Sequence, residues 1–171
     1  MLPKKTAPSS SVPSAPSKAM DEIIKAPVNG TVLPLSEVKD DAFAGGVLGM
    51  GAAIVPENGN ICAPCSGIIS AMYPTGHAVG IQSDAGAEIL IHIGMDTVSM
   101  NGDGFTVKVK EGEAVRAGDL LVCADLKKIR AAGLDTTTPV IVTNSDEYLE
   151  IRQDAAGTVR QGDTLLSCIG K

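Results

Sequence analysis

The feature that most constrains the fold of this chain is a succession of short apolar runs separated by glycine-containing turns. Runs of this length, bounded by turn residues, are typical of β-strands rather than helices. Glycine supplies the unusual backbone angles that tight turns need. The sequence therefore predicts an all-β fold, with strands near residues 30–35, 67–72, 79–83, 88–93, 106–110, 120–123, 140–143, 157–160 and 165–168.

Aliphatic side chains have to fill the interior of this fold. Hydrophobic residues make up 44% of the chain, but aromatic residues make up only 2%, whereas there are 19 glycines. Only two short helical segments are expected. One spans residues 124–132 (ADLKKIRAA), which Gly133 would end as a C-cap, and the other is a turn near residues 145–149.

The 171 residues fit one domain with a short tail. Residues 1–20 are rich in Pro, Ser, Ala and Lys, a composition that cannot bury enough apolar surface to offset its ordering entropy. We expect a flexible linker or tail over 1–20 and a folded domain over 21–171. That domain carries 11 basic and 20 acidic residues, a net charge of −9, which disfavours nucleic acid and suits a basic protein partner.

A cytoplasmic location is expected. No apolar run approaches the roughly 18 residues of a transmembrane helix, and the start of the chain lacks the apolar stretch of a signal peptide. The four cysteines would then be reduced. Cys62 and Cys65 form a Cys-x-x-Cys pair, but no helix signal follows it, so we interpret the pair as structural or incidental.

Two short motifs occur twice. The pattern Ala-Pro-x-x-Gly is found at residues 26–30 and 63–67, and Val-Arg-x-Gly-Asp at 115–119 and 159–163. The first pattern would open a strand and the second would close one. Two copies of both indicate a duplication, with two similar hairpin modules packed as a sandwich.

The chain has two histidines, His77 and His92. Two predicted strands and a turn separate them, and a hairpin of that length brings its two ends together. His92 interrupts an apolar strand and should share a face with Leu90 and Gly94. We expect Gly94 to leave open space next to the ring.

Such a pair of histidines suits phosphoryl transfer. Neutral imidazole is a good nucleophile near neutral pH, and an apolar depression would protect a phosphohistidine from water. His77 could stabilise the phosphoryl group, and the Thr75 hydroxyl could fix the tautomer of a nearby ring. From composition and spacing alone, two purely structural histidines explain the sequence equally well.

The segments HIGMDTV (92–98) and NGDGF (101–105) resemble the signature of the glucose-type EIIA domain of the bacterial phosphoenolpyruvate:sugar phosphotransferase system (PTS). The resemblance covers about residues 21–169. Further segments match in order, at 26–30, 35–38, 63–67, 75–78, 81–84, 111–112, 115–119, 138–142 and 144–146.

The resemblance implies an antiparallel β-sandwich with a duplicated hairpin motif and no cofactor. It implies that Nε2 of His92 takes phosphate from the carrier protein HPr, that His77 supports the phosphoryl group, and that Thr75 hydrogen-bonds within the pair. Asp40, Phe43 and Asp96 match positions that meet HPr.

The same resemblance implies an acceptor as well as a donor. The phosphate would pass to a cysteine of an EIIB domain and then to the incoming sugar. The chain would be either free-standing or associated with an EIIC membrane domain, and nucleic acid would not be a partner.

The sequence also departs from the pattern of the family. Aromatic residues commonly line the family's active-site depression, whereas Val79 and Ile93 are expected near the histidines here. Met50 stands in the segment Gly49-Met50-Gly51, where Asp is usual.

Two alternatives remain open at this stage. One is a zinc-dependent hydrolase of related β-architecture, although a catalytic zinc needs three protein ligands and the chain has only two histidines. Adventitious zinc at His77 and His92 would not require a third ligand from this chain. The other is a lipoyl- or biotinyl-type carrier, which would need a modified lysine at a hairpin tip, typically beside Met.

Overall fold

The computed structural model of the chain describes residues 20–171. The linker predicted for residues 1–20 therefore lies outside the described residues, apart from Met20, and it stays a prediction. Within the described part of the chain, no helix is long and apolar enough to cross a membrane.

Over residues 20–171 the structure is mostly β, as predicted, with two short α-helices, α1 (Asp41–Ala44) and α2 (Leu126–Ala131). Three 3-10 helices accompany them, η2 (Leu35–Glu37), η3 (Thr97–Met100) and η4 (Ser145–Glu147). The strands are β1 (Glu22–Lys25), β2 (Gly30–Pro34), β3 (Met50–Pro56), β4 (Asn60–Cys62), β5 (Gly67–Met72), β6 (Ala78–Ser83), β7 (Glu88–His92), β8 (Phe105–Val107), β9 (Ala114–Val115), β10 (Leu120–Ala124), β11 (Thr138–Val142), β12 (Tyr148–Gln153), β13 (Gly157–Val159) and β14 (Thr164–Gly170).

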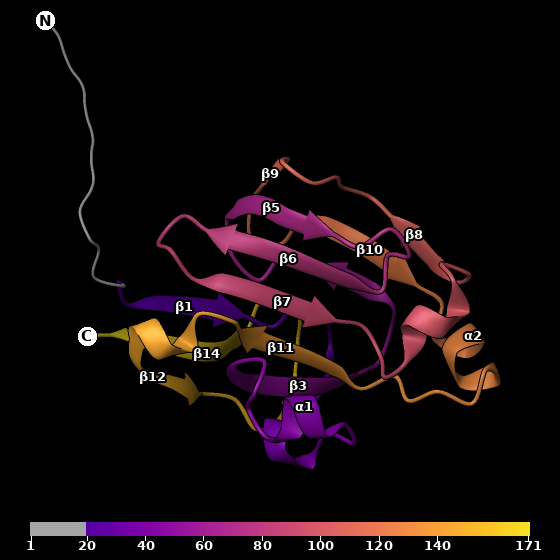
Figure 1. Cartoon of the computed structure of the whole chain (residues 1–171), viewed down its shortest axis with the longest axis horizontal. Coiled ribbons are helices and arrows are strands. Elements are labelled where there is room, and N and C mark those ends of the chain that lie inside the picture. Colours follow the sequence, from indigo (N-terminus) through magenta and orange to yellow (C-terminus); the bar gives the residue numbers. More distant parts are fainter. Residues whose placement is uncertain (1–19) are drawn as a thin grey trace, which may run out of the picture.

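These strands form an antiparallel β-sandwich. The largest sheet has eight strands in the order β13-β2-β3-β11-β7-β6-β5-β9, and two three-stranded sheets have the orders β1-β14-β12 and β4-β10-β8. Figure 1 looks onto the middle of the large sheet, with β5, β6, β7, β11 and β3 side by side and α1 beyond β3.

The large sheet buries apolar side chains on both faces. Its inner face packs against the smaller sheets in the main core, which is almost entirely aliphatic, as the composition predicts. The outer face carries a second cluster, in which Phe43 of α1 and Leu35 of η2 cover Ala53, Met95 and Ile141. This second cluster fixes α1 beside the end of β7.

The predicted duplication is visible in the hydrogen bonds of the two repeated motifs. Ala26 N–H donates to Asp163 O (2.7 Å) and its carbonyl accepts from Gly162 N–H (3.0 Å). In the other copy, Ala63 N–H donates to Asp119 O (2.7 Å) and its carbonyl accepts from Gly118 N–H (2.8 Å). Each Ala-Pro-x-x-Gly segment is thus held by one Val-Arg-x-Gly-Asp turn through the same pair of bonds.

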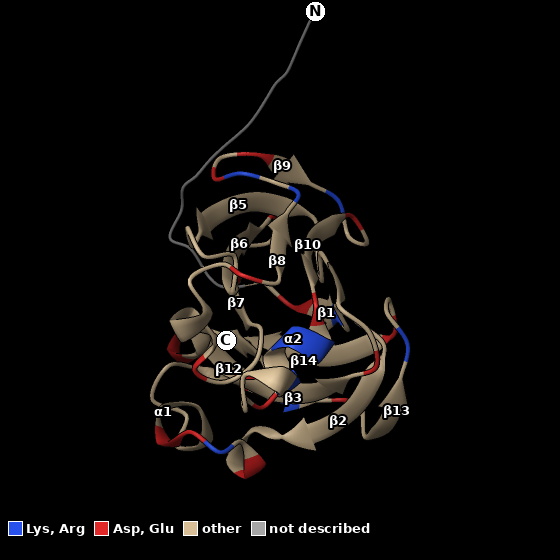
Figure 2. Cartoon of the chain, turned by 90° about the vertical axis from the view of Figure 1, so that its right-hand side faces the viewer, with Lys and Arg blue, Asp and Glu red and all other residues tan. Residues whose placement is uncertain are grey.

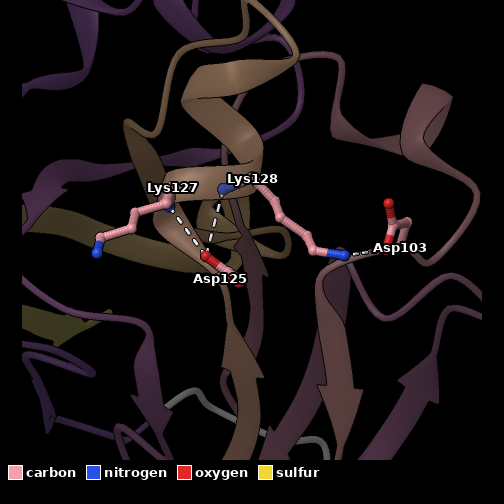
Figure 3. Close-up of polar contacts among 4 residues, drawn as sticks. All are labelled: Asp103, Asp125, Lys127 and Lys128. Carbon is pink, nitrogen blue, oxygen red and sulfur yellow. Dashed lines mark hydrogen bonds and ion pairs between the residues drawn. The ribbon is translucent and has the colours of Figure 1, made fainter.

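Helix α2 begins and ends near the predicted limits. The carboxylate of Asp125 accepts from the backbone N–H groups of Lys127 (3.1 Å) and Lys128 (3.2 Å) and so caps the helix (Figure 3). Gly133, at φ +79°, ends it. The Lys128 ammonium pairs with Asp103 at 2.7 Å (Figure 3), but both side chains are more than half exposed, so this ion pair contributes little stability.

Strand β3 makes a central contribution to the core, and this can be tested at two adjacent residues. Ile54 is fully buried, whereas Val55 is 37% exposed. We expect Ile54→Ala to lower the free energy of unfolding by about 2–5 kcal/mol, because it removes buried methyl groups and leaves a cavity. Val55→Ala, the matched control, should cost less than about 1 kcal/mol. Urea denaturation of both variants measures the difference, and equal losses would contradict this assignment of the core.

Candidate functional site

His92 is the last residue of β7, on the outer face of the large sheet. Along this strand Ile89 and Ile91 are buried in the main core, whereas Leu90 and His92 are half-buried on the opposite face. This alternation is the one that the sequence predicts. The imidazole therefore emerges at the end of a strand that is fixed on both sides, by β6 and β11.

The tautomer of His92 is set by the backbone that follows it. Its Nδ1 lies 2.8 Å from the carbonyl oxygen of Gly94. Because a carbonyl only accepts, Nδ1 carries the proton and donates it. The neutral ring therefore has its lone pair on Nε2, which is the nitrogen that remains available as a nucleophile.

The space around Gly94 is filled, whereas an open gap was expected there. It adopts φ +77°, a left-handed conformation that favours glycine. A Cβ atom there would lie 2.6 Å from Thr97 Cγ2 and 2.9 Å from Asp135 O. The expectation of free space beside the ring was wrong, and glycine is needed because the backbone turns in a crowded place.

His77 lies in the turn that precedes β6 and is 5% exposed. Ala78 pairs with His92 across the β6–β7 ladder, and Ile93 N–H donates to the His77 carbonyl (2.7 Å). The two imidazoles consequently meet, with ring centroids 5.1 Å apart and ring planes at 81°. The hairpin predicted from the spacing of the histidines is confirmed in this respect.

Thr75 contacts His77, as the sequence indicates. The Thr75 hydroxyl and His77 Nδ1 form a short hydrogen bond. Residues of the 101–107 segment support this turn, because a Cβ on Gly76 would lie 3.1 Å from Phe105 Cβ and one on Gly102 would lie 3.7 Å from Thr75 O. The backbone around His77 is thus packed against a neighbouring loop.

Two aromatic side chains complete the site. Phe43 is 4% exposed, and its ring centroid lies 5.1 Å from that of His92. Tyr73 is 42% exposed and meets His77 edge-on at 5.4 Å. Four rings thus follow one another in the order Phe43, His92, His77, Tyr73.

The expectation that the site lacks aromatic residues was therefore wrong. Val79 and Ile93, which were expected to replace them near the histidines, are fully buried in the main core. Phe43 reaches His92 only through the packing of α1 on the sheet, whereas Tyr73 lies just four residues before His77 and could have been found from the sequence.

Both histidines are neutral at physiological pH. Burial is the largest effect on each ring and lowers its pKa. The nearby His92 lowers the pKa of His77 further. For His92 the hydrogen bond to Gly94 and the charges of Asp40 and Asp96 raise the pKa, but they do not outweigh burial.

Two carboxylates stand at the rim of the site. Asp40 caps α1, where its side chain accepts from Ala42 N–H (2.9 Å). Asp96 is exposed and precedes η3 with φ 60°. Both act on His92 electrostatically, so the structure brings these predicted partner residues to the same side as the histidine. In Figure 2, stretches of ribbon coloured red for Asp and Glu lie at α1 and next to it.

Exposed apolar side chains on the same two segments were not anticipated from the sequence. Val47 (81% exposed) and Leu48 follow α1, Val98 (54%) lies in η3, and Met50 (50%) begins β3. Such residues mark a surface for a protein partner when they rim a polar centre. They lie near Asp40 and Asp96 in the sequence, and only the exposure that the structure shows distinguishes them from core residues.

The other candidates from the sequence do not form a site. Cys65 is buried, and burial raises its pKa to about 12; burial raises the pKa of Cys62 as well, which disfavours a reactive thiolate at the Cys-x-x-Cys pair. Within residues 20–171, no group of three or more His, Cys, Asp or Glu side chains could hold a metal ion.

Comparison with known families identifies this arrangement. Residues 22–148 match the family described as phosphoenolpyruvate-dependent sugar phosphotransferase system, EIIA 1. Among solved structures, the glucose permease IIA from Mycoplasma capricolum superposes with a TM-score of 0.79 at 39% identity, covering 86% of this chain and 95% of that one.

Curated relatives fall into two kinds. A glucose-specific EIIA component of Halalkalibacterium halodurans is 46% identical over 149 residues, which cover 87% of this chain and 86% of that protein. A beta-glucoside-specific EIIBCA component of Bacillus subtilis is 51% identical over 146 residues, and here the chain spans only 24% of the longer relative. This chain belongs to the EIIA 1 family of the phosphoenolpyruvate-dependent sugar phosphotransferase system.

Proposed function

We propose that this chain accepts a phosphoryl group on Nε2 of His92 from phosphorylated HPr and passes it to a cysteine of an EIIB domain. The observation that carries the proposal is the bond from His92 Nδ1–H to Gly94 O, which leaves the Nε2 lone pair free beside the second imidazole. Membership of the EIIA family supports phosphoryl transfer as the reaction.

In the first step the Nε2 lone pair attacks phosphorus. The new P–N bond forms as the P–N bond of the donor breaks, and the donor imidazole leaves with the bonding electrons. Nδ1 keeps its proton throughout, and the positive charge that develops on the ring is stabilised by the Gly94 carbonyl. In the second step the acceptor thiolate attacks phosphorus, the P–N bond at His92 breaks, and Nε2 recovers its lone pair.

His77 stabilises the group in transit. If its Nδ1 accepts from the Thr75 hydroxyl, the ring proton sits on Nε2, where it can donate to a phosphoryl oxygen. With its proton on Nε2 and its Nδ1 lone pair engaged by the Thr75 hydroxyl, this ring donates a hydrogen bond and has no free lone pair with which to compete for the phosphoryl group. Phe43 and Tyr73 flank the pair and limit the access of water.

Two observations support the proposed partners: the residues at the rim of the site and the domain composition of the relatives. Asp40 and Asp96 would meet basic residues of HPr, and the exposed Val47 and Val98 would meet apolar ones. In the EIIBCA relatives, the A component belongs to the same chain as the B and C components. We infer a cytoplasmic site of action, an EIIB acceptor that serves an EIIC domain, and a sugar of the glucose or beta-glucoside type.

Phosphorylation of two histidine variants tests the roles of the pair. Incubated with phosphoenolpyruvate, Enzyme I and HPr, the wild type should gain about 80 Da as an acid-labile, alkali-stable adduct. His92→Gln should gain nothing, because the nucleophile is absent. His77→Gln should still gain the group but transfer it to EIIB about 100-fold or more slowly, because a flexible amide does not keep a donor in the position of the ring that Thr75 fixes. Intact-mass spectrometry and a rapid-quench transfer assay make these measurements.

A wild type that gains no mass from a competent donor would refute the carrier function. An adduct that survives in His92→Gln would refute the assignment of the nucleophile. Circular dichroism of each variant is the control for folding.

The pKa directions predict the response to pH. The pKa of His92 lies below the ordinary value of about 6.5. Nε2 therefore stays unprotonated as the pH falls from about 8 to about 6.5, and protonation removes its nucleophilic lone pair only at lower pH. An NMR titration of the imidazole carbons should therefore give midpoints below about 6.5 for both histidines.

The coupling of the two rings predicts a further shift. In His92→Gln the pKa of His77 should rise, because the neighbouring ring no longer opposes its protonation, but it should stay below the ordinary value because burial remains. An unchanged His77 midpoint in this variant would contradict the proximity of the two rings.

A further inference from the structure

The peptide group between Gly94 and Met95 is held from both sides. Its carbonyl oxygen lies 2.8 Å from His92 Nδ1, and its N–H donates to the backbone carbonyl of Asp135 at 2.9 Å. In a trans peptide the C=O and N–H bonds point in opposite directions. The Asp135 carbonyl therefore determines where the Gly94 carbonyl points.

Asp135 is itself fixed. Its carboxylate accepts from the backbone N–H of Thr137 (2.9 Å) and from the Thr137 hydroxyl (2.8 Å). The side chain is half-buried, and it lies between α2 and β11, the strand that pairs with β7. This local turn gives the Asp135 carbonyl one orientation relative to the end of β7.

Thr97 holds the preceding peptide, between Ile93 and Gly94. It is fully buried, and its hydroxyl donates to the Ile93 carbonyl at 2.5 Å. Its methyl group stands where a Cβ on Gly94 would lie. Gly94 thus lies between two peptides that are each held: Thr97 holds the Ile93–Gly94 peptide, and the Asp135 carbonyl holds the Gly94–Met95 peptide.

We propose that Asp135 and Thr97 are positioning residues that select the reactive tautomer of His92 by fixing the two peptides on either side of Gly94. The relay runs from the Asp135 carbonyl through the Gly94–Met95 peptide to Nδ1 of the ring. Hydrogen bonds that share a peptide polarise one another, so the bond from Met95 strengthens the Gly94 carbonyl as an acceptor. The tautomer of a histidine follows the bond that its other nitrogen makes.

Two pairs of variants test this relay on the free protein. Asp135→Ala removes the acceptor that fixes the turn, whereas Asp135→Asn keeps a side-chain oxygen for the same two donors. Thr97→Val removes the hydroxyl at nearly constant shape, whereas Thr97→Ser keeps it. Long-range proton–nitrogen NMR of histidine-labelled protein distinguishes the two tautomers, and the chain has only two histidines to assign.

The wild type should show His92 with its proton on Nδ1 only. Asp135→Ala and Thr97→Val should show a mixture of tautomers, together with a lower His92 pKa, since the bond to Gly94 raises that value. Asp135→Asn and Thr97→Ser should stay close to the wild type. Thermal unfolding checks each variant, and Asp135, being half-buried, tolerates replacement better than Thr97.

A His92 ring that keeps a single Nδ1 tautomer in folded Asp135→Ala and Thr97→Val would overturn the inference. Loss of the tautomer in Asp135→Asn as well would also overturn it, since general loosening of the loop and not the specific bond would then be responsible.

The expected effect on phosphorylation rests on the function proposed above. Misplacement of a reacting group lowers rates by up to about 100-fold, so we expect a decrease of about tenfold in phosphoryl acceptance for Asp135→Ala. The tautomer experiment needs no phosphoryl donor. If the wild type accepts no phosphate but the variants shift the tautomer, the relay stands and the proposed function fails. If the wild type accepts phosphate but the variants keep the wild-type tautomer, the proposed function stands and the relay fails.

Discussion

The pairing of β6 with β7 is the interaction on which the site depends. Ala78 lies opposite His92, and the His77 carbonyl accepts from Ile93 N–H at 2.7 Å, so one ladder fixes both imidazoles relative to each other. The turn of this hairpin is held by the Ser83 hydroxyl, which accepts from Ala87 N–H (2.8 Å) and donates to Glu22 (2.6 Å). A shift of one residue in this register would turn His92 into the aliphatic core.

Burial and charge act in opposite directions at this ladder. Removal from water favours neutral rings, whereas Asp40 and Asp96 favour protonated ones, and burial dominates at His92. That order matters, because a protonated imidazole has no lone pair to offer. The carboxylates therefore leave the nucleophile neutral, and under the proposed function they would attract a basic partner.

Local patterns predicted most of the fold. Short apolar runs identified β5, β6, β7 and β10 closely, and the repeated motifs identified the duplication, because both signals lie within a few consecutive residues. Strands β1, β3, β4, β9 and β12 were missed. Of these, β1, β4 and β9 have only two to four residues, β3 begins Met-Gly-Ala-Ala, and β12 alternates with exposed charged residues at a sheet edge. Spacing predicted that the two histidines meet, and the family resemblance added the role of Thr75 and the position of Phe43. Asp135 was missed, because it reaches the site only through tertiary packing.

The charges around His92 would also affect the stability of its phosphorylated form. The charged groups that act on this ring are two carboxylates, which would repel a phosphoryl group on Nε2. The free protein would therefore hold the group with hydrogen bonds alone, and a docked partner would have to bring the positive charge. A carrier needs this arrangement, because a site that neutralised the phosphoryl group fully would stabilise the intermediate and slow its transfer to the acceptor.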